Sequence, residues 1–364
     1  MREYVNKVLT GDCLDVMPRL PDGCVDAVFA DPPYNLQLGG KMLYRPEDQT
    51  ATRAVRDNWD SFASPYEYNE FTRRWLAECQ RVLRPDGAMW VIGTYHNIFQ
   101  IGAIMQEMGF WILNDISWVK TNPMPNFRGT RFTNAHETLL WAVPKKTGKY
   151  TFNYETMKQY NGGKQMRSDW HIDICLGAER LKDADGKSLH STQKPMELLR
   201  RVILSSTKQG DLILDPFFGS GTTGAVAREL SRNFIGIEQS AEYVVAARAR
   251  IADISPADLS LLEVARPKRD EEKVAFVELI ANGLLLPGQT LIGKRGDRVM
   301  ITRDGQLVHT LLGRASIHVM AAKIQNVASF NGWDYWSAER KNGALVSIDE
   351  IRKIYRDIKR HMAV

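Results

Sequence analysis

The residues Asp31-Pro32-Pro33-Tyr34 could hold an amino group beside a flat ring. They follow a short apolar run, Val25 to Ala30, which predicts an interior parallel strand that ends at a site. Two consecutive prolines fix φ and lack N–H groups, so they hold the chain extended and leave the Pro32 carbonyl free to accept. The Asp31 carboxylate and this carbonyl can both accept from one amino group, while Tyr34 offers a ring for stacking. The tetrapeptide therefore predicts a cradle for the exocyclic amino group of an aromatic base.

A second candidate site follows another apolar strand, Leu212 to Leu214, in the second half of the chain. Gly219 and Gly221 let the backbone approach a ligand, and the helix that starts beside them presents N–H groups suited to a carboxylate. The turn lacks the GxGxxG spacing of dinucleotide sites. The next strand, Asn233 to Ile237, ends in Glu238, where a carboxylate can hold two ribose hydroxyls. The form Phe218-Gly219-Ser220-Gly221-Thr222 looks like the loop that binds S-adenosylmethionine.

Together the two motifs resemble those of the beta class of amino-methyltransferases, enzymes that methylate adenine N6 or cytosine N4 in nucleic acid. The resemblance covers roughly residues 4 to 255, with the catalytic motif first, a recognition region next and the cofactor motif last. It implies that Asp31, Pro32, Pro33 and Tyr34 are catalytic and that the cofactor is S-adenosyl-L-methionine. The cofactor-binding residues that it implies are Asp12, Thr192, Lys194, Asp215, Phe217, Gly219, Ser220, Gly221, Thr222 and Glu238.

Three of these residues precede the strand that leads to the glycine-rich turn. Asp12 follows a predicted strand, Val5 to Thr10, and in the family order it would accept from the amino group of the cofactor adenine. The alternative, that Asp12 simply caps the next helical segment, stays open. Lys194 and Thr192 precede a predicted helix and, by the resemblance, would position the methionine end of the cofactor.

The segment between the two motifs alternates between predicted helices and strands. Ser64 is the expected N-cap of a helix, with Pro65 at its first position and Glu67 completing a capping box. The turn 85–87 ends this helix, and a strand at 88–93, a helix at 98–108 and strands at 111–119 and 137–143 follow. This alternation predicts an α/β fold: an open, mostly parallel, Rossmann-like sheet with helices on both faces. The resemblance adds a permuted motif order and an antiparallel edge strand, formed where the last two strands pair as a hairpin.

The length and composition of the chain favour a two-domain intracellular enzyme. A chain of 364 residues suits a main domain and a smaller one. It has no apolar stretch long enough to span a membrane and no signal-peptide pattern, so we expect a cytoplasmic protein that, by the resemblance, associates with the bacterial nucleoid. The four cysteines stand singly, which favours reduced, structural thiols and no metal site.

Composition divides the chain into a catalytic domain at 1–262, a charged linker at 263–272 and a C-terminal domain at 273–364. The C-terminal part contains a short helix, a predicted hairpin around Asp304-Gly305 and two further helices, which make a small α+β module. It resembles the domain appended to restriction-associated adenine methylases. The formal net charge is +5, and the basic excess lies entirely beyond Arg266. Such asymmetry suits contact with a polyanion, although a solvated basic surface would give the same count.

Candidate DNA contacts fall in four segments, of which the last, 314–336, lies in the C-terminal module, where Trp333 and Trp336 could equally belong to the core. The polar segment 39–60 is predicted to be a mobile lid that closes on DNA, and 120–136 looks like the wall of the flipped-base pocket. Basic residues interleave with aromatic ones at 145–190, which fits a target-recognition region, although an irregular loop that packs its own aromatics would look similar. The candidates are Lys41, Arg45, Asn122, Arg128, Arg131, Lys164, Arg167, Arg314, Ser316, Asn331 and Trp333.

The whole chain resembles the cell-cycle-regulated DNA adenine methyltransferases of alphaproteobacteria. That resemblance implies adenine in GANTC as the target, double-stranded DNA as the partner, a base flipped out of the helix and a role linked to replication; a homodimer stays open. Cytosine-N4 enzymes usually carry Ser in place of Asp31, and methylases of protein glutamine or RNA amines usually carry Asn. A non-catalytic DNA-binding regulator with the same fold is the alternative from another class.

Overall fold

The computed structural model describes residues 1–34, 43–44, 51–52, 62–126, 129–146, 149–183, 186–190, 192–257, 272–340 and 343–362. The chain forms two compact units, Met1–Pro267 and Lys268–Val364. The division between them lies inside the segment expected to be a linker.

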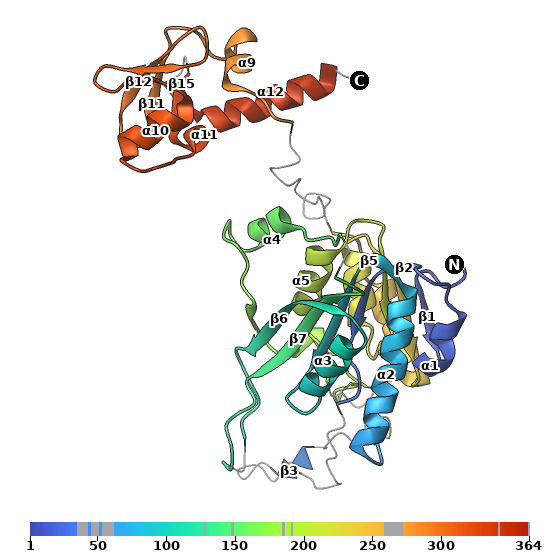
Figure 1. Ribbon diagram of the computed structural model, residues 1–364. Helices are drawn as coiled ribbons and strands as arrows, with labels where there is room; N and C mark the ends of the chain where they lie inside the picture. The colour runs from blue at the N-terminus through green and yellow to red at the C-terminus, as the bar shows by residue number, and fades with distance from the viewer. Residues whose placement is uncertain are drawn as a thin grey trace. The chain divides into compact units, whose positions relative to one another are not determined.

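The first unit is built on an eight-stranded sheet in the order β1-β10-β9-β2-β5-β7-β6-β8 (Figure 1). All neighbouring pairs are parallel except the two that involve β7, which runs antiparallel to both β5 and β6. The strands are β1 (Lys7–Thr10), β2 (Val25–Ala30), β5 (Leu83–Gly93), β6 (Trp111–Lys120), β7 (His136–Val143), β8 (Asp169–Ile172), β9 (Leu212–Asp215) and β10 (Asn233–Glu238). The predicted α/β class, with a mostly parallel sheet, is confirmed.

Two details of the sheet differ from the prediction. The antiparallel strand β7 lies inside the sheet, because β6 pairs on its far side and β8 then forms the edge. The sequence missed β8 since its four residues, Asp169 to Ile172, alternate with too few apolar positions to stand out. Strand β5 also starts before the predicted turn at 85–87, and its pairing with β2 shifts register between Val25 and Ala27 to absorb the extra residues.

Helices cover both faces of this sheet. On one face α1, α2 and α3 pack against it, and on the other α4, α5, α6 and α7 do so. The central strands are apolar throughout because each face of the sheet has its own hydrophobic core and successive residues point to opposite faces. In β2, Phe29 lies in one core and Val28 in the other. The helices are α1 (Cys13–Val16), α2 (Pro65–Val82), α3 (Ile98–Glu107), α4 (Tyr154–Tyr160), α5 (Met196–Ser206), α6 (Thr222–Glu229) and α7 (Ala241–Ala252).

Helix α2 begins where its capping residues predict. The Ser64 side chain accepts a hydrogen bond from the Glu67 amide, and Pro65 stands at the first helical position. The Glu67 carboxylate accepts from the Ala63 amide, one residue earlier than a standard capping box would place it. The apolar stripe of α2 is buried against the sheet through Trp75, whose side chain has no exposed area.

The second unit is a six-stranded antiparallel sheet in the order β14-β13-β12-β11-β15-β16, packed against helices. Its strands are β11 (Thr290–Gly293), β12 (Arg298–Ile301), β13 (Leu307–His309), β14 (Gly313–Ala315), β15 (Trp336–Glu339) and β16 (Leu345–Ser347). Its helices are α9 (Phe276–Ala281), α10 (Ile317–Gln325), α11 (Gly332–Tyr335) and α12 (Ile348–Met362). The expected hairpin is present as β12 and β13.

The structure corrects the expectation that Trp333 contacts DNA bases. Its side chain is only 8% exposed and belongs to the core of the second unit. The Phe276 ring packs against it, and the Arg352 guanidinium lies 4.1 Å from its ring centre. Trp336 is fully buried beside it and donates to the Ile317 carbonyl. Both tryptophans are therefore core residues, because a small domain needs large side chains to fill its interior.

The described part of the chain lacks two features. No helix there has the length and apolar character that crossing a bilayer requires. The same residues contain no cluster of three or more His, Cys, Asp or Glu side chains placed to hold a metal ion.

Candidate active site

The candidate site lies where the parallel strands of the first unit end. Asp31 follows β2, Asp215 ends β9 and Glu238 ends β10, while Asp12 follows β1. Parallel pairing places these carboxyl ends at one edge of the sheet, and the β1–β10 register sets Thr10 opposite Glu238. Ligands of open α/β sheets bind in the crevice outside this edge.

A cavity of about 820 Å³ joins the two motifs. Its volume lies within the range of small-molecule sites, about 300–1,000 Å³. The catalytic residues Asp31, Pro32, Pro33 and Tyr34 line it on one side. Of the predicted cofactor-binding residues, all but Gly221 line it as well: Asp12, Thr192, Lys194, Asp215, Phe217, Gly219, Ser220, Thr222 and Glu238. Residues that are almost two hundred positions apart in the sequence therefore face one chamber.

The glycine-rich turn owes its path to backbone conformations that favour glycine. Gly219 has φ +50° and Gly221 has φ +76°. At Gly221 a Cβ atom would lie 2.7 Å from the Cβ atom of Ala247 in α7, so the turn packs directly on that helix. Gly221 therefore shapes the turn from behind, although it does not reach the cavity.

Two carboxylates hold the turn in place. Asp215 accepts from the Phe217 amide at 3.0 Å and from the Thr223 hydroxyl at 2.5 Å. Glu238 accepts from the Gly219 amide and from the Ser240 amide, both at 2.8 Å. Each Glu238 oxygen has a second lone pair, so the carboxylate can still accept from ribose hydroxyls in the cavity that it lines.

Asp12 plays the capping role that the sequence left open. One of its carboxylate oxygens accepts from the Leu14 amide at 2.8 Å, and the other accepts from the Gln239 side chain at 2.9 Å. Asp12 also lines the cavity. The capping role is therefore compatible with a contact to an adenine amino group.

The donor set of this half of the cavity fits S-adenosylmethionine. The glycine turn and the first turn of α6 offer backbone N–H groups for a carboxylate, and Glu238 offers acceptors for ribose hydroxyls. Phe217 adds an apolar wall. These residues are the ones that would hold the cofactor.

The catalytic motif is anchored by its neighbours. The Pro33 carbonyl accepts from the Tyr68 hydroxyl at 2.8 Å, which ties the motif to helix α2. The Tyr34 hydroxyl lies 2.9 Å from Asp31 Oδ1 and 3.1 Å from Glu137 Oε2. The side chains of Asp31 and Tyr34 are thus fixed with respect to each other before any ligand binds.

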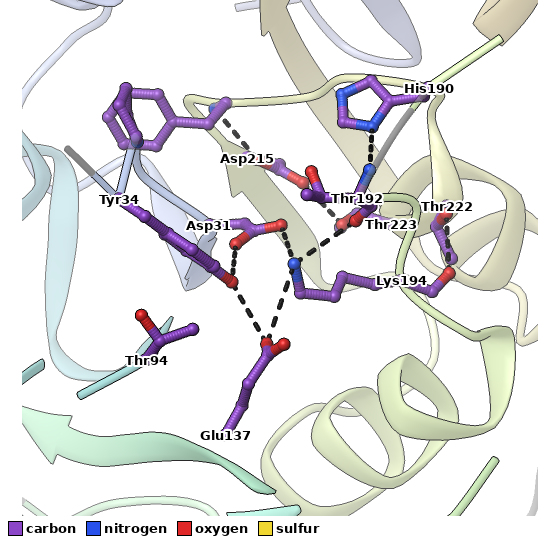
Figure 2. Close-up of polar contacts among 12 residues, drawn as sticks. Asp31, Tyr34, Thr94, Glu137, His190, Thr192, Lys194, Asp215, Thr222 and Thr223 are labelled. Atoms are coloured by element: carbon purple, nitrogen blue, oxygen red, sulfur yellow. Dashed lines mark hydrogen bonds and ion pairs between the residues drawn. The ribbon is translucent and has the colours of Figure 1, made fainter. Parts of the chain in front are cut away.

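Two lysines complete a buried charged cluster, of which Figure 2 shows Asp31, Glu137 and Lys194. The Lys194 ammonium donates to Asp31 Oδ2 at 2.6 Å and lies 3.9 Å from Glu137 Oε2. The Lys120 ammonium lies 2.8 Å from Glu137 Oε1. Two carboxylates and two ammonium groups therefore balance each other's charge, as buried charges require, and Asp31 and Lys194 of this cluster line the cavity.

Burial and pairing shift the titration of the cluster. Burial raises the pKa of the Asp31 carboxyl, although the Lys194 ammonium opposes this rise. Burial would also raise the pKa of Glu137, but Lys194 and Lys120 outweigh it and hold that pKa below its usual value. Burial raises the pKa of the Tyr34 hydroxyl well above its usual value. Of the two acids, Asp31 is therefore the better proton acceptor.

Comparison with known proteins decides the family. Residues 25–249 match the model of the N6/N4 DNA methylases, described as DNA methylase, which is more than half of the chain. The chain belongs to this family. The expectation of a DNA methyltransferase is thereby confirmed.

The relatives agree with this assignment. The methylase is 46% identical to the Type II methyltransferase M.HinfI of Haemophilus influenzae over 98% of both chains. It is 42% identical to the Type II methyltransferase M2.DpnII of Streptococcus pneumoniae, over 69% of this chain and 92% of that one. Among solved structures, the cytosine-N4-specific PvuII DNA methyltransferase has a TM-score of 0.53 at 20% identity, over 72% of this chain and 93% of that one. That likeness supports the fold.

Two members of the methylase's charged cluster were missed by the sequence analysis. Glu137 is the second residue of β7, ahead of a mostly apolar run, and Lys120 ends β6. Because β6 and β7 form a hairpin, opposite charges at these two strand ends meet. The antiparallel direction of β7 brings its first residues to the edge where Asp31 lies. A charged residue at each end of a predicted hairpin was the signal that could have found this pair.

Two residues of the methylase with expected roles contact each other and Asp31 in the structure. Lys194 was expected to position the methionine end of the cofactor, but its ammonium is bound to Asp31. Tyr34 was expected to stack on a base, but its side chain is only 7% exposed and the Lys194 ammonium lies over its ring, 5.2 Å from the centre. In this conformation that face of the ring is not open to a base.

The candidate DNA contacts of the methylase's first unit have varied surroundings. Lys41, Arg45 and Arg128 lie outside the described residues, as does most of the predicted lid. The Asn122 side chain accepts from the Ile174 amide, and Arg131 donates to the Tyr95 hydroxyl. Lys164 and Arg167 are exposed, and Arg167 pairs with Asp169.

The aromatic residues of the methylase's predicted recognition region divide into two groups. Trp170 is buried beside Trp90 in the core of the first unit, as the packing alternative predicted. Tyr150 and Phe152 pack against Trp141 but keep 46% and 43% of their surface exposed. Tyr154 and Tyr160 are likewise 37% and 39% exposed, so these four residues offer rings to a ligand outside the core.

We expect Asp215 to make the methylase less stable as pH rises. Burial raises the pKa of Asp215 to about 7 in the folded protein, against about 3.9 in an unfolded chain. Between these values the folded state binds the extra proton, so the free energy of unfolding falls as pH increases through this window.

Urea unfolding of the wild type and Asp215→Asn at pH 5 and pH 8 measures the effect. The wild type should lose on the order of 2 kcal/mol more than the variant. Equal losses in the two proteins would show that Asp215 ionises normally.

Proposed function

We propose that this methylase transfers a methyl group from S-adenosylmethionine to N6 of an adenine in double-stranded DNA. The observation that carries the proposal is the shared cavity, in which the Asp31 carboxylate faces the same space as the turn at Gly219. An acceptor for an exocyclic amine and a site for a nucleoside carrying a carboxylate are the two halves that amine methylation needs.

The chemistry assigned to the residues follows from the amine. Adenine N6 shares its lone pair with the ring and is a poor nucleophile until hydrogen bonds draw it towards tetrahedral geometry. Asp31 and the Pro32 carbonyl accept these bonds. When bound, S-adenosylmethionine supplies an electrophilic methyl group, and the new N–C bond forms as the C–S bond breaks. The amine then gives up a proton, and Asp31 is the acceptor within reach. Positioning supplies much of the acceleration.

The base must leave the duplex to reach this site. Its N6 atom lies inside the helix, whereas Asp31 lies at the floor of a cavity, so the nucleotide is flipped out at a cost of a few kcal/mol. Asp31 favours adenine over cytosine, since cytosine-N4 enzymes of the family usually carry Ser at this position. M.HinfI and M2.DpnII, named as Type II methyltransferases, support a site-specific DNA substrate.

We further propose that the methylase recognises GANTC and that it has a role linked to replication or the cell cycle at the bacterial nucleoid. Both rest on the resemblance to the cell-cycle-regulated methyltransferases. M.HinfI matches 98% of this chain, so a relative of this kind spans the catalytic part and the C-terminal unit together.

The test is transfer of labelled methyl to duplexes with GANTC or with its adenine replaced, followed by nucleoside analysis. We expect N6-methyladenine from the first duplex only. N4-methylcytosine, or equal label in both duplexes, would remove the substrate assignment. No label in either would favour a DNA-binding regulator.

We also propose that the C-terminal unit binds DNA through Arg314. Its side chain is 54% exposed and pairs with Asp304, whereas Ser316 and Asn331, two other candidates, cap α10 and α11. Arg314→Ala should weaken duplex binding and reduce the slope of log affinity against log salt by about 1, because one phosphate contact is lost. Asp304→Ala frees Arg314 and should strengthen binding. Equal salt slopes for wild type and Arg314→Ala would contradict the assignment.

A further inference from the structure

Lys194 occupies the acceptor that the substrate needs. Its ammonium donates to Asp31 Oδ2 at 2.6 Å and to the Thr192 carbonyl at 3.3 Å. The other Asp31 oxygen, Oδ1, is bound by the Tyr34 hydroxyl. An ammonium group makes a stronger, charge-assisted hydrogen bond to a carboxylate than a neutral amine does. An arriving adenine amino group therefore meets a carboxylate that a better donor already holds.

Glu137 offers Lys194 a second carboxylate partner. Its Oε2 atom lies 3.9 Å from the Lys194 ammonium, so a shift of about 1 Å brings the two to hydrogen-bond distance. Its other oxygen is held by Lys120 at 2.8 Å, which fixes the carboxylate in place. Lys194 can thus leave Asp31 without carrying an unpaired charge into a buried site, which would be costly.

We propose that Lys194 stands in for the substrate amino group on Asp31 in the free enzyme, and that Glu137 receives Lys194 when the amine arrives. This inference rests on the proposed function, because it requires an amine substrate. Lys194 and Glu137 are positioning residues in this scheme, since they act through Asp31.

The exchange helps the proton leave the product. While the Lys194 ammonium sits on Asp31 it lowers the pKa of that carboxyl. Its move towards Glu137 removes part of that effect, so Asp31 becomes more basic as the amine binds. The proton released from N6 then passes to Asp31 Oδ2, the oxygen that Lys194 has left.

The test compares the affinity of two duplexes that differ only in the amino group. One carries adenine at the target position and the other carries purine, which lacks N6. Binding is measured with S-adenosylhomocysteine present, so that no methyl group is transferred. The quantity of interest is the preference for adenine over purine.

Lys194→Met removes the competing donor while keeping a side chain of similar length. We expect it to raise the preference for adenine roughly tenfold over the wild type, since the amine no longer displaces a charged donor. Lys208→Met, an exposed lysine in a turn, is the matched control and should leave the preference unchanged. An unchanged or lower preference in Lys194→Met would overturn the proposal, because Lys194 and the amine would then share Asp31 without competing.

Glu137→Gln tests the same exchange in the opposite direction. It removes the charge that receives Lys194, so the preference for adenine should fall below that of the wild type, and adding Lys194→Met should restore it. A preference that stays at the wild-type value in Glu137→Gln would show that Glu137 does not receive Lys194.

Methyl transfer by the wild type is measured in parallel. Its absence would remove the proposed function. Intact methyl transfer, together with adenine-over-purine preferences in the variants that differ from those expected, would contradict only the proposed exchange of Lys194 between Asp31 and Glu137.

Discussion

Replacing Asp31 by alanine should lower kcat by about a thousandfold while the affinity for S-adenosylmethionine changes by less than about threefold. Asp31 is the side chain that accepts from the substrate amine, and its loss leaves the amine flat and poorly nucleophilic. The cofactor half of the cavity is held by Asp215 and Glu238 and does not depend on Asp31. Lys194 remains near Glu137, so the buried charge keeps a partner.

Single-turnover methyl transfer and calorimetric titration of the cofactor measure the two quantities separately. Asp22→Ala is the control, since Asp22 is 80% exposed and pairs with Arg81 at the surface. It should behave as the wild type in both measurements. If Asp31→Ala lost cofactor binding and turnover to the same extent, Asp31 would belong to the cofactor site instead.

Gly221→Ala should destabilise the protein by roughly 2–4 kcal/mol and weaken cofactor binding at least about tenfold. The residue has φ +76°, and its new Cβ would lie 2.7 Å from the Ala247 Cβ and 3.1 Å from the Ala247 Cα. Neither atom belongs to a flexible side chain, so the turn itself must move away from α7. The Gly219 amide, which bonds to Glu238, would move with it.

Two further variants separate the cost of backbone strain at a positive φ from the cost of the steric clash with Ala247. Gly210 has φ +81° with no atom within 4 Å of an added Cβ, so Gly210→Ala should cost only about 1 kcal/mol and leave cofactor binding unchanged. Adding Ala247→Gly to Gly221→Ala removes the closest contact and should recover part of the loss. Identical behaviour of Gly221→Ala and Gly210→Ala would mean that packing on α7 has no role in the site.

The sequence predicted the parts of the fold that depend on local signals. Ser64 and Pro65 indicated the start of α2, and the apolar run at Val25–Ala30 indicated β2. Both signals are local, because helix capping and strand burial depend on residues that are neighbours in the sequence. The resemblance to the amino-methyltransferases implied which residues belong to the site, and all of them except Gly221 line the cavity. The class of sheet followed from the alternation of elements.

The parts that depend on distant pairing were not predictable in this way. The interior place of β7 depends on which strands lie beyond it, and β8 pairs with β6 across some fifty residues of intervening chain. The contact between Lys194 and Asp31 joins residues 163 positions apart, so no local pattern records it. Trp333 carries no sequence signal that separates a core ring from a base-stacking ring, and packing decided its place.

The structure of a complex with a target duplex and a non-reactive S-adenosylmethionine analogue would test the central claim most directly. The quantity to measure is the distance from the target adenine N6 to Asp31 Oδ2. We expect a flipped adenine with N6 within about 3.2 Å of that oxygen, facing the turn at Gly219. An adenine that stays stacked in the duplex, or one that enters the cavity with N6 pointing away from Asp31, would contradict the assignment of Asp31 as the acceptor.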